Sequence, residues 1–340
     1  MSSSCYVYHA QHKSAGVTFM NTLVAWVLQR PDVNGNSSEC QHCDRCGAFA
    51  CRTCDNYKGR WSWDDFGCRK ATSAALVQQQ PRLLTNGFVL PLAMVEAWRR
   101  PTCVWITVFR EPLSRLVSAF FYCKHSMDDP LCARHHVNTR GGKLEGFAHH
   151  WGSFGFRELL LYPPLRAIVT NTTGSPETHT NSSAERDVDP MWWVWKQIVH
   201  EHDRGEDLSH HAGARNFAAL TKAFPAMYDL VGILERRAET CALLDARLPW
   251  LPLATSAHAS APGSGGRHWC DELTSHTETH SASEGWPAAD EAAWVAAALS
   301  EARNSSTIAK ALEADLRVYR TLAVPRFEGL LTELQERRRS

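Results

Sequence analysis

Short apolar runs alternate with stretches of helical periodicity along much of the chain. Residues 5–8, rich in Tyr and Val, have the pattern of a buried strand. After a polar turn at 12–17, apolar side chains return at helical spacing, at Phe19, Met20, Leu23, Val24 and Val27. The chain therefore begins with a predicted strand–turn–helix unit.

A second unit of the same kind spans residues 102–122. Cys103–Phe109 is an apolar run of the kind buried in parallel sheets, and Arg110-Glu111-Pro112 ends it. The apolar residues beyond the interruption predict a helix, at Leu113, Leu116, Val117, Phe120 and Phe121.

Two further strands are predicted, at Arg82–Thr85 before an Asn86-Gly87 turn, and at Tyr228–Leu234. Helical patterns cover most of 71–80, 90–98, 143–162, 217–224, 238–248, 291–299 and 305–334. This alternation indicates an α/β fold with a parallel sheet. The 340 residues suffice for one large domain or two smaller ones, and no internal repeat divides them. We place one domain at 1–340, with a Cys-rich insertion at about 32–70 and a flexible loop at about 254–286.

Composition favours a globular protein without a long-range electrostatic partner. Hydrophobic residues make up 44% of the chain, and 13 residues are Trp. Lys and Arg number 36 against 36 Asp and Glu, so no net field favours nucleic acid or membrane lipid. Any basic surface for an acidic ligand must therefore be local.

The turn after the first strand is a candidate anion site. Backbone N–H groups at a helix start lack intrahelical partners, and the helix dipole adds partial positive charge. Lys13 adds a full charge, so phosphate or sulfate suits this position. An ordinary strand–helix corner explains the turn equally well, and a Walker A loop cannot be read here.

Together, the two units resemble the Golgi-type carbohydrate sulfotransferases. The segment 12–18, His-Lys-Ser-Ala-Gly-Val-Thr, is similar to their 5′-phosphosulfate loop, roughly H-K-[ST]-[AG]-[GS]-x-T. Arg110-Glu111-Pro112 with Arg115 and Ser118 is similar to their 3′-phosphate motif, R-[DE]-P-x-x-R-x-x-S. Both the order and the spacing of the two motifs fit.

Later segments extend the resemblance to most of the chain, although only the two cofactor motifs are specific. They are Tyr228–Gly232 with Glu235, and Leu316 with Tyr319. The galactose 3-O- and the uronyl or heparan 2-O-sulfotransferases look nearest. The resemblance implies a P-loop-like three-layer α/β domain, with a central parallel sheet flanked by helices. It also implies the co-substrate 3′-phosphoadenosine 5′-phosphosulfate (PAPS), a glycan or glycoconjugate acceptor and no required metal.

The resemblance also assigns roles to residues. Lys13 would stand beside the bridging oxygen, where negative charge develops during in-line transfer to a hydroxyl. Arg110, a fork donor suited to phosphate, and Ser118 would hold the 3′-phosphate, and Arg267 is a second candidate phosphate contact. The 5′-phosphosulfate would be held by the side chains and backbone N–H groups of Ser14, Ala15, Gly16, Val17 and Thr18.

The general base is where the chain departs from the family. The relatives place a His or Glu after the second strand, but residues 85–89 read Thr-Asn-Gly-Phe-Val, and no His lies between Cys43 and Lys124. General-base help is worth roughly 10²–10⁴ in rate, so the difference matters. Three possibilities stay open: a carboxylate, a histidine near the phosphosulfate, or PAPS binding without efficient transfer. The candidate residues are Glu96, Asp64, Asp65, His9 and His12.

Cysteine usage leaves a choice between disulfides and zinc. Of the 12 Cys, six fall in the insertion, at Cys40, Cys43, Cys46, Cys51, Cys54 and Cys68. Paired C-x-x-C spacing suits tetrahedral zinc, with Cys40, Cys43, Cys51 and Cys54 as the ligand set, whereas an oxidising compartment would give disulfides. Cys123 with Cys132 and Cys241 with Cys270 are two further candidate disulfides.

Four N-x-[ST] sequons favour the Golgi lumen or another secretory compartment, at Asn36, Asn171, Asn181 and Asn304. Met1–Ser4 leads straight into the first strand without a signal or anchor, so a membrane link would need a segment outside this sequence. A cytoplasmic location is the alternative.

Two rival functions stay open. One is a PAPS- or nucleotide-binding domain with weak or no turnover, joined to the Cys cluster as a zinc or disulfide module. The other is a P-loop-type kinase, which would need an acidic residue at the end of the second unit's strand, where this chain has Arg110. The acceptor sugar cannot be read from the sequence.

Overall fold

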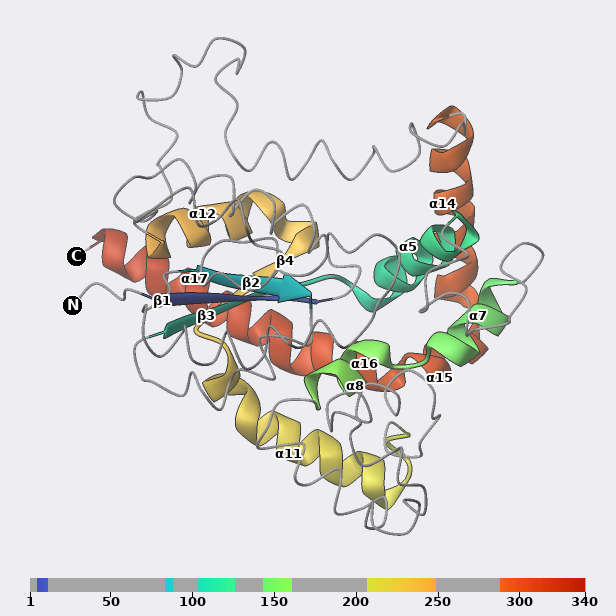
Figure 1. The fold of residues 1–340 in the computed structure, drawn as a ribbon, viewed down its shortest axis with the longest axis horizontal. Coiled ribbons are helices and arrows are strands. Elements are labelled where there is room, and N and C mark those ends of the chain that lie inside the picture. Colours follow the sequence, from blue (N-terminus) through green and yellow to red (C-terminus); the bar gives the residue numbers. More distant parts are fainter. Residues whose placement is uncertain are drawn as a thin grey trace, which may run out of the picture.

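The computed structural model describes residues 5–11, 83–87, 103–125, 143–160, 207–248 and 288–339 (Figure 1). Four strands in these ranges form one sheet of order β2-β1-β3-β4, in which every neighbouring pair is parallel. The strands are β1 (Cys5–Ala10), β2 (Leu83–Gly87), β3 (Cys103–Phe109) and β4 (Leu230–Ile233). The predicted parallel sheet is thereby confirmed.

One detail of the strand prediction is wrong. Asn86 and Gly87 belong to β2, where they pair with His9 and Ala10 of β1, and they do not form the predicted turn. Hydrogen bonding to a central strand has overridden the local turn preference of the Asn-Gly pair. The predicted strand at 103–109, by contrast, has the observed bounds.

The helices are longer and more segmented than the sequence pattern predicted. The helix predicted at 217–224 is the middle of α11 (His211–Met227), and the helix predicted at 305–334 is divided into several pieces. The other helical elements are α5 (Pro112–His125), α7 (Leu144–Trp151), α8 (Phe154–Leu159), η4 (Leu234–Arg236), α12 (Arg237–Arg247), α14 (Ala288–Asn304), α15 (Ser306–Ala311), α16 (Glu313–Val318), η5 (Tyr319–Ala323) and α17 (Val324–Arg339).

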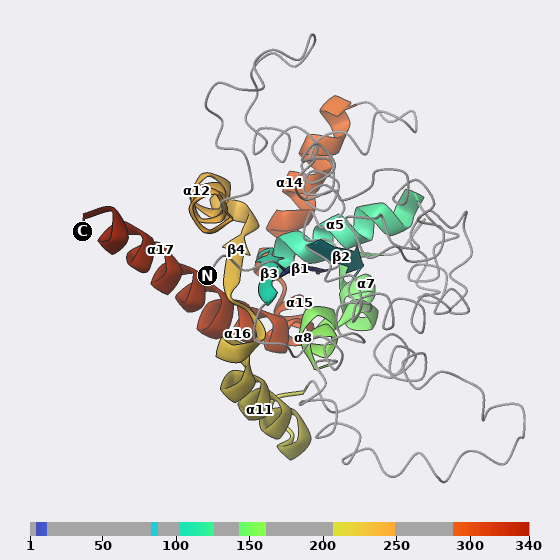
Figure 2. The same cartoon turned by 60° about the vertical axis from the view of Figure 1, so that its left-hand side comes forward.

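Helices pack on both sides of β4. In Figures 1 and 2, α12 lies on one side of the sheet and α11 on the other. Val231 and Ile233 of β4 share an apolar core with Phe224 of α11 and Phe327 of α17. Gly232 faces α12 so closely that an added Cβ would lie 2.5 Å from Cγ2 of Thr240. The described part of the chain is therefore an α/β arrangement with a helix-flanked parallel sheet.

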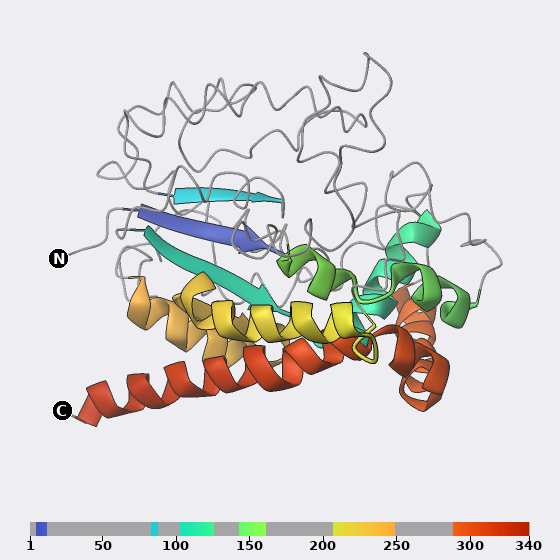
Figure 3. The same ribbon diagram turned by 90° about the horizontal axis from the view of Figure 1, so that it is seen from below.

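A second apolar core lies beyond the carboxyl ends of the strands, among α5, α7, α14 and α15 (Figure 3). Phe147, Trp151 and Phe154 stack at its centre, with ring centroids 5.6 and 4.6 Å apart. Among the described residues, no helix is both long enough and apolar enough to cross a membrane.

Candidate functional site

The carboxyl ends of β1 and β3 lie side by side in the middle of the sheet. His9 stands opposite Thr107 in the register, and the Thr107 hydroxyl donates to the His9 carbonyl oxygen at 2.9 Å. Gln11 follows β1 and donates from Nε2 to the Thr107 hydroxyl at 3.3 Å. The strand order reverses direction between β1 and β3, and ligands of open α/β sheets bind at such a switch point.

Arg110 stands at this switch point, directly after β3 and before α5. Burial lowers the pKa of Arg110, Arg237 and Arg115 act in the same direction, and Glu235 and Glu111 oppose them. An arginine stays protonated at neutral pH despite such a shift. The position therefore combines a fixed positive charge with partial exclusion of water.

Glu235 fixes the beginning of α5. Its Oε1 accepts from the Glu111 backbone N–H at 3.0 Å, and its Oε2 accepts from the Tyr319 hydroxyl at 3.2 Å. The Glu111 carboxylate in turn accepts from the Ser114 N–H at 2.8 Å, which satisfies an amide of the first helical turn. Three segments quoted for the family resemblance thus meet at this helix start.

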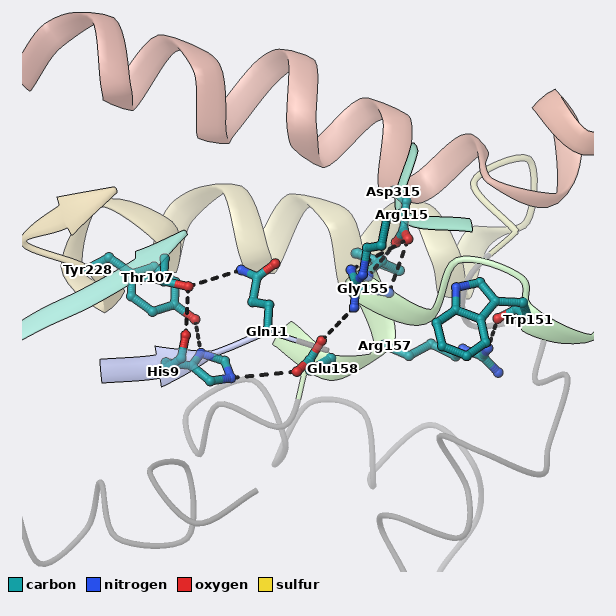
Figure 4. Close-up of polar contacts among 11 residues, drawn as sticks. His9, Gln11, Thr107, Arg115, Trp151, Gly155, Arg157, Glu158, Tyr228 and Asp315 are labelled. Carbon is teal, nitrogen blue, oxygen red and sulfur yellow. Dashed lines mark hydrogen bonds and ion pairs between the residues drawn. The ribbon is translucent and has the colours of Figure 1, made fainter. Parts of the chain in front are cut away.

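A network of buried charged and polar side chains lies behind the switch point (Figure 4). Arg115 of α5, only 4% exposed, donates from Nη2 to Glu158 Oε2 at 2.8 Å. Its Nη1 lies 4.0 Å from Oδ2 of Asp315. The guanidinium is therefore engaged by two buried carboxylates, one from α8 and one from α16.

His9 extends the network to β1. Its Nδ1 lies 2.5 Å from the Tyr228 hydroxyl, and its Nε2 lies 3.8 Å from Glu158 Oε1. Burial lowers the pKa of His9 to about 3, and Arg115 acts in the same direction. The imidazole is therefore neutral at physiological pH, and its approach to Glu158 is not an ion pair. A buried, neutral imidazole held in this way fits a structural role better than that of an acceptor base.

Asp315 joins α16 to the start of α8. Its carboxylate accepts from the Phe156 N–H at 2.5 Å and from the Gly155 N–H at 3.1 Å. Burial raises the pKa of Asp315, whereas Arg115 and these amides lower it. A Cβ added to Gly155 would lie 2.0 Å from Nη1 of Arg115, so the guanidinium would have to shift to admit a larger residue.

Of the predicted cofactor residues, Arg110 and Ser118 are in the described ranges, at the start and on the body of α5. Ser118 is half-buried. The others lie outside the described residues, and they are His12, Lys13, Ser14, Ala15, Gly16, Val17, Thr18, Asp64, Asp65, Glu96, Arg267 and the zinc candidates Cys40, Cys43, Cys51 and Cys54.

Sequence reasoning missed Glu158, Asp315 and the partnership of His9 with Tyr228. Glu158 is a charge within a mostly apolar stretch, which is a weak signal of a buried partner. Asp315 falls in an ordinary helical pattern, so the sequence gives no signal that its carboxylate is buried. Their roles depend on residues distant in sequence, because Glu158 bonds Arg115, which is 43 residues before it, and Asp315 accepts from the Phe156 N–H, which is 159 residues before it.

Two cysteines of the predicted disulfides are described, and both Cys123 and Cys241 are disulfide-bonded. The proposed partners Cys132 and Cys270 lie outside the described ranges. The sequon residue Asn304 ends α14 and is exposed, as the polar context predicted. Within the described ranges, no group of three or more His, Cys, Asp or Glu side chains is arranged to hold a metal ion.

No family model, curated protein or solved structure matches the chain. The structural guide to function is therefore the arrangement of the β1 and β3 ends and Arg110 at the switch point.

Proposed function

We propose that this protein is a PAPS-dependent sulfotransferase that moves a sulfuryl group to a hydroxyl of a galactose- or uronic-acid-type glycan. One observation carries the proposal: β1 and β3 are parallel neighbours that end at the same edge, at the topological switch point. The candidate phosphosulfate segment 12–18 begins just after Gln11, and the candidate 3′-phosphate motif begins at Arg110. The two motifs therefore start from adjacent positions.

The surroundings of Arg110 support a bisphosphate nucleotide as the ligand. A partly desolvated guanidinium interacts more strongly with phosphate than an exposed one does. The position after β3 is also where a P-loop kinase would need an acidic residue, so a cation there favours a 3′-phosphate. In this proposal the complete domain is a P-loop-like three-layer fold.

The proposed reaction is a displacement at sulfur. The acceptor oxygen forms a bond to sulfur, and the bond between sulfur and the bridging phosphate oxygen breaks to release 3′-phosphoadenosine 5′-phosphate. Lys13 would stabilise the charge that develops on that oxygen. The acceptor proton would pass to Asp64, Asp65, Glu96 or His12.

We propose the Golgi lumen or a related secretory compartment as the site of action. Disulfide bonding at Cys123 and Cys241 is typical of proteins from oxidising compartments. The exposed Asn304 begins an Asn-Ser-Ser sequon and suits N-glycosylation in the same compartments.

A transfer assay with sulfur-labelled PAPS and a panel of desulfated glycans tests the activity. We expect transfer to galactose- or uronic-acid-containing acceptors by the wild type, and a loss of about 10²–10³ in kcat for Lys13→Ala. Lys222→Ala is the matched control because Lys222 is exposed on α11. Bisphosphate binding without transfer to any acceptor would contradict the proposed activity and support a non-catalytic binding domain.

A further inference from the structure

Glu235 holds the peptide unit that joins Arg110 to Glu111. Its Oε1 accepts from the Glu111 backbone N–H at 3.0 Å, and that N–H belongs to the same planar unit as the Arg110 carbonyl group. Glu235 itself lies in η4, directly after β4. The bond therefore fixes the backbone that carries the Arg110 side chain from the end of a neighbouring strand.

A second hydrogen bond orients the Glu235 carboxylate. The Tyr319 hydroxyl donates to its Oε2 at 3.2 Å. Burial raises the pKa of Tyr319, and the charge of Glu235 acts in the same direction, so the hydroxyl keeps its proton and is the donor. Each carboxylate oxygen thus has a donor of its own.

Tyr319 also begins a π-helical turn. The turn, η5 (Tyr319–Ala323), lies between α16 and α17. Turns of this kind are rare within helices and are frequent at functional sites. The irregular turn therefore points to the same place as the hydrogen bonds of Glu235, and it does so independently of them.

Stability does not account for this arrangement. Glu235 is exposed and Tyr319 is half-buried, and a hydrogen bond of an exposed carboxylate adds little to the free energy of unfolding, because water replaces it. The charge of Glu235 acts on Arg110, and by itself it would weaken the binding of phosphate there. Its benefit to Arg110 must therefore come from its hydrogen bonds.

Arg110 is the better placed of the two arginines in the 3′-phosphate motif. The other, Arg115, donates from Nη2 to Glu158 at 2.8 Å, and its Nη1 lies 4.0 Å from Asp315. Both of these carboxylates are buried, so the Arg115 guanidinium serves the core. The orientation of Arg110 is then what decides how well this motif binds a phosphate.

We propose that Glu235 and Tyr319 are positioning residues, which fix the Arg110–Glu111 peptide so that the Arg110 guanidinium is preorganised for the 3′-phosphate of a nucleotide. This inference rests on the proposed function. A preorganised group binds its ligand more tightly, because less conformational entropy is lost on binding. The hydrogen bonds of Glu235 thus favour binding while its charge opposes it, and variants can separate the two effects.

Calorimetric titration of the full chain with 3′-phosphoadenosine 5′-phosphate and with adenosine 5′-phosphate tests the proposal. The monophosphate Kd divided by the bisphosphate Kd gives the preference for the 3′-phosphate. We expect this preference to fall about tenfold in Glu235→Ala and about threefold in Tyr319→Phe. The double variant should lose no more than Glu235→Ala alone, because Tyr319 acts through Glu235.

Glu235→Gln should keep at least the preference of the wild type. Its amide oxygen can accept from the Glu111 N–H and its NH2 group can donate to the Tyr319 hydroxyl, while the negative charge is removed. A purely electrostatic role of Glu235 predicts a different pattern, in which the alanine and glutamine variants both gain preference for the 3′-phosphate.

Two control variants remove similar groups close by. Glu239→Ala removes an exposed carboxylate that is bonded to Arg236. Thr321→Ala removes a hydroxyl of the same π-helical turn, which donates at 2.8 Å to the Arg317 carbonyl oxygen of its own helix. Both should keep the preference of the wild type.

The outcomes separate this inference from the proposed function. A wild type without preference for the 3′-phosphate would overturn both. A preference that Arg110→Ala abolishes and that Glu235→Ala and Tyr319→Phe leave unchanged would overturn the inference alone. A gain in Glu235→Ala, equal weakening of both nucleotides, or the same loss in the controls would also overturn it. If Glu235→Ala does not fold, Tyr319→Phe decides, and an unchanged preference there overturns the inference.

Discussion

At the scale of single residues, His9 shows how surroundings change chemistry. An imidazole in water has a pKa near 6.5 and readily accepts protons, which made His9 a candidate base by sequence. Complete burial between Tyr228 and Glu158, with Arg115 behind Glu158, makes the charged form unfavourable. The residue therefore connects neighbouring elements as a neutral group.

The lowered pKa of His9 predicts a pH dependence of stability. Between its unfolded pKa of 6.5 and its folded pKa of about 3, the unfolded chain binds a proton at this position and the folded chain does not. His9 therefore costs the folded chain nothing above its unfolded-state pKa of 6.5. Below that pH, its effect lowers the free energy of unfolding by at most about 1.4 kcal/mol per pH unit. We expect urea unfolding between pH 7 and pH 5 to show a shallower loss for His9→Gln than for the wild type.

The control for this measurement is His211→Gln, because His211 is exposed on α11. Its pH slope should match that of the wild type. The raised pKa of Asp315 acts in the opposite direction, but it is common to the variants and cancels in the comparison. Identical slopes for His9→Gln and the wild type would show that the pKa of His9 is the same in the folded and the unfolded chain, which would contradict its burial as a neutral group.

At the scale of elements, replacing a helical glycine with alanine should have opposite effects on the free energy of unfolding at two positions. Gly155 in α8 leaves no room for a Cβ beside Nη1 of Arg115 and Oδ2 of Asp315, whereas Gly329 in α17 has nothing within 4 Å. We expect Gly155→Ala to lower the free energy of unfolding by about 1–3 kcal/mol because Arg115 must move away from Glu158. Gly329→Ala should raise it by up to about 1 kcal/mol, because alanine favours helix.

Thermal and urea unfolding of the two alanine variants measure both effects. Equal effects of the two substitutions would mean that the packing of Arg115 on α8 is not as described. A Gly155→Ala variant as stable as the wild type would have the same meaning.

Element boundaries were predictable where local pattern and tertiary context agree. Cys103–Phe109 is apolar apart from Thr107, and its residues 106–109 are buried in the middle of the sheet, so its bounds could be read directly. Asn86-Gly87 is a turn signal by local preference, but pairing with β1 decides its conformation. The ends of α11 were missed because its polar first turns lack the apolar spacing that marks its centre.

The candidate site was predictable only where a motif carries it. Arg110 and Ser118 could be named as candidates because their spacing resembles a known phosphate motif. Glu158 and Asp315 could not, since each gains its role from Arg115, which α5 brings to them from a distant part of the chain. Buried charge networks of this kind are set by tertiary packing, not by local pattern.

At the scale of the whole molecule, disulfides should contribute to stability. Cys123 lies in the core beyond the sheet and Cys241 lies in α12, so these two bonds involve different parts of the fold. We expect Cys241→Ser to lower the free energy of unfolding by about 2–4 kcal/mol under oxidising conditions. Urea unfolding with and without reductant measures this effect, and it should vanish when the wild type is reduced.

Labelling with a thiol reagent is the check on that result. Cys123 and Cys241 should stay unmodified in the denatured, unreduced wild type. Modification of either cysteine without reductant would contradict its disulfide bond.

The central claim is that the switch point between β1 and β3 binds a nucleotide with a 3′-phosphate. The most direct test is calorimetric binding of 3′-phosphoadenosine 5′-phosphate, compared with ADP, to the wild type and to Arg110→Ala. We expect the wild type to bind the bisphosphate more tightly than ADP, and Arg110→Ala to lose about 1.5–3 kcal/mol of that preference, the usual value of a charge-assisted hydrogen bond. Binding of ADP as tightly as the bisphosphate, unchanged by Arg110→Ala, would contradict the sulfotransferase proposal.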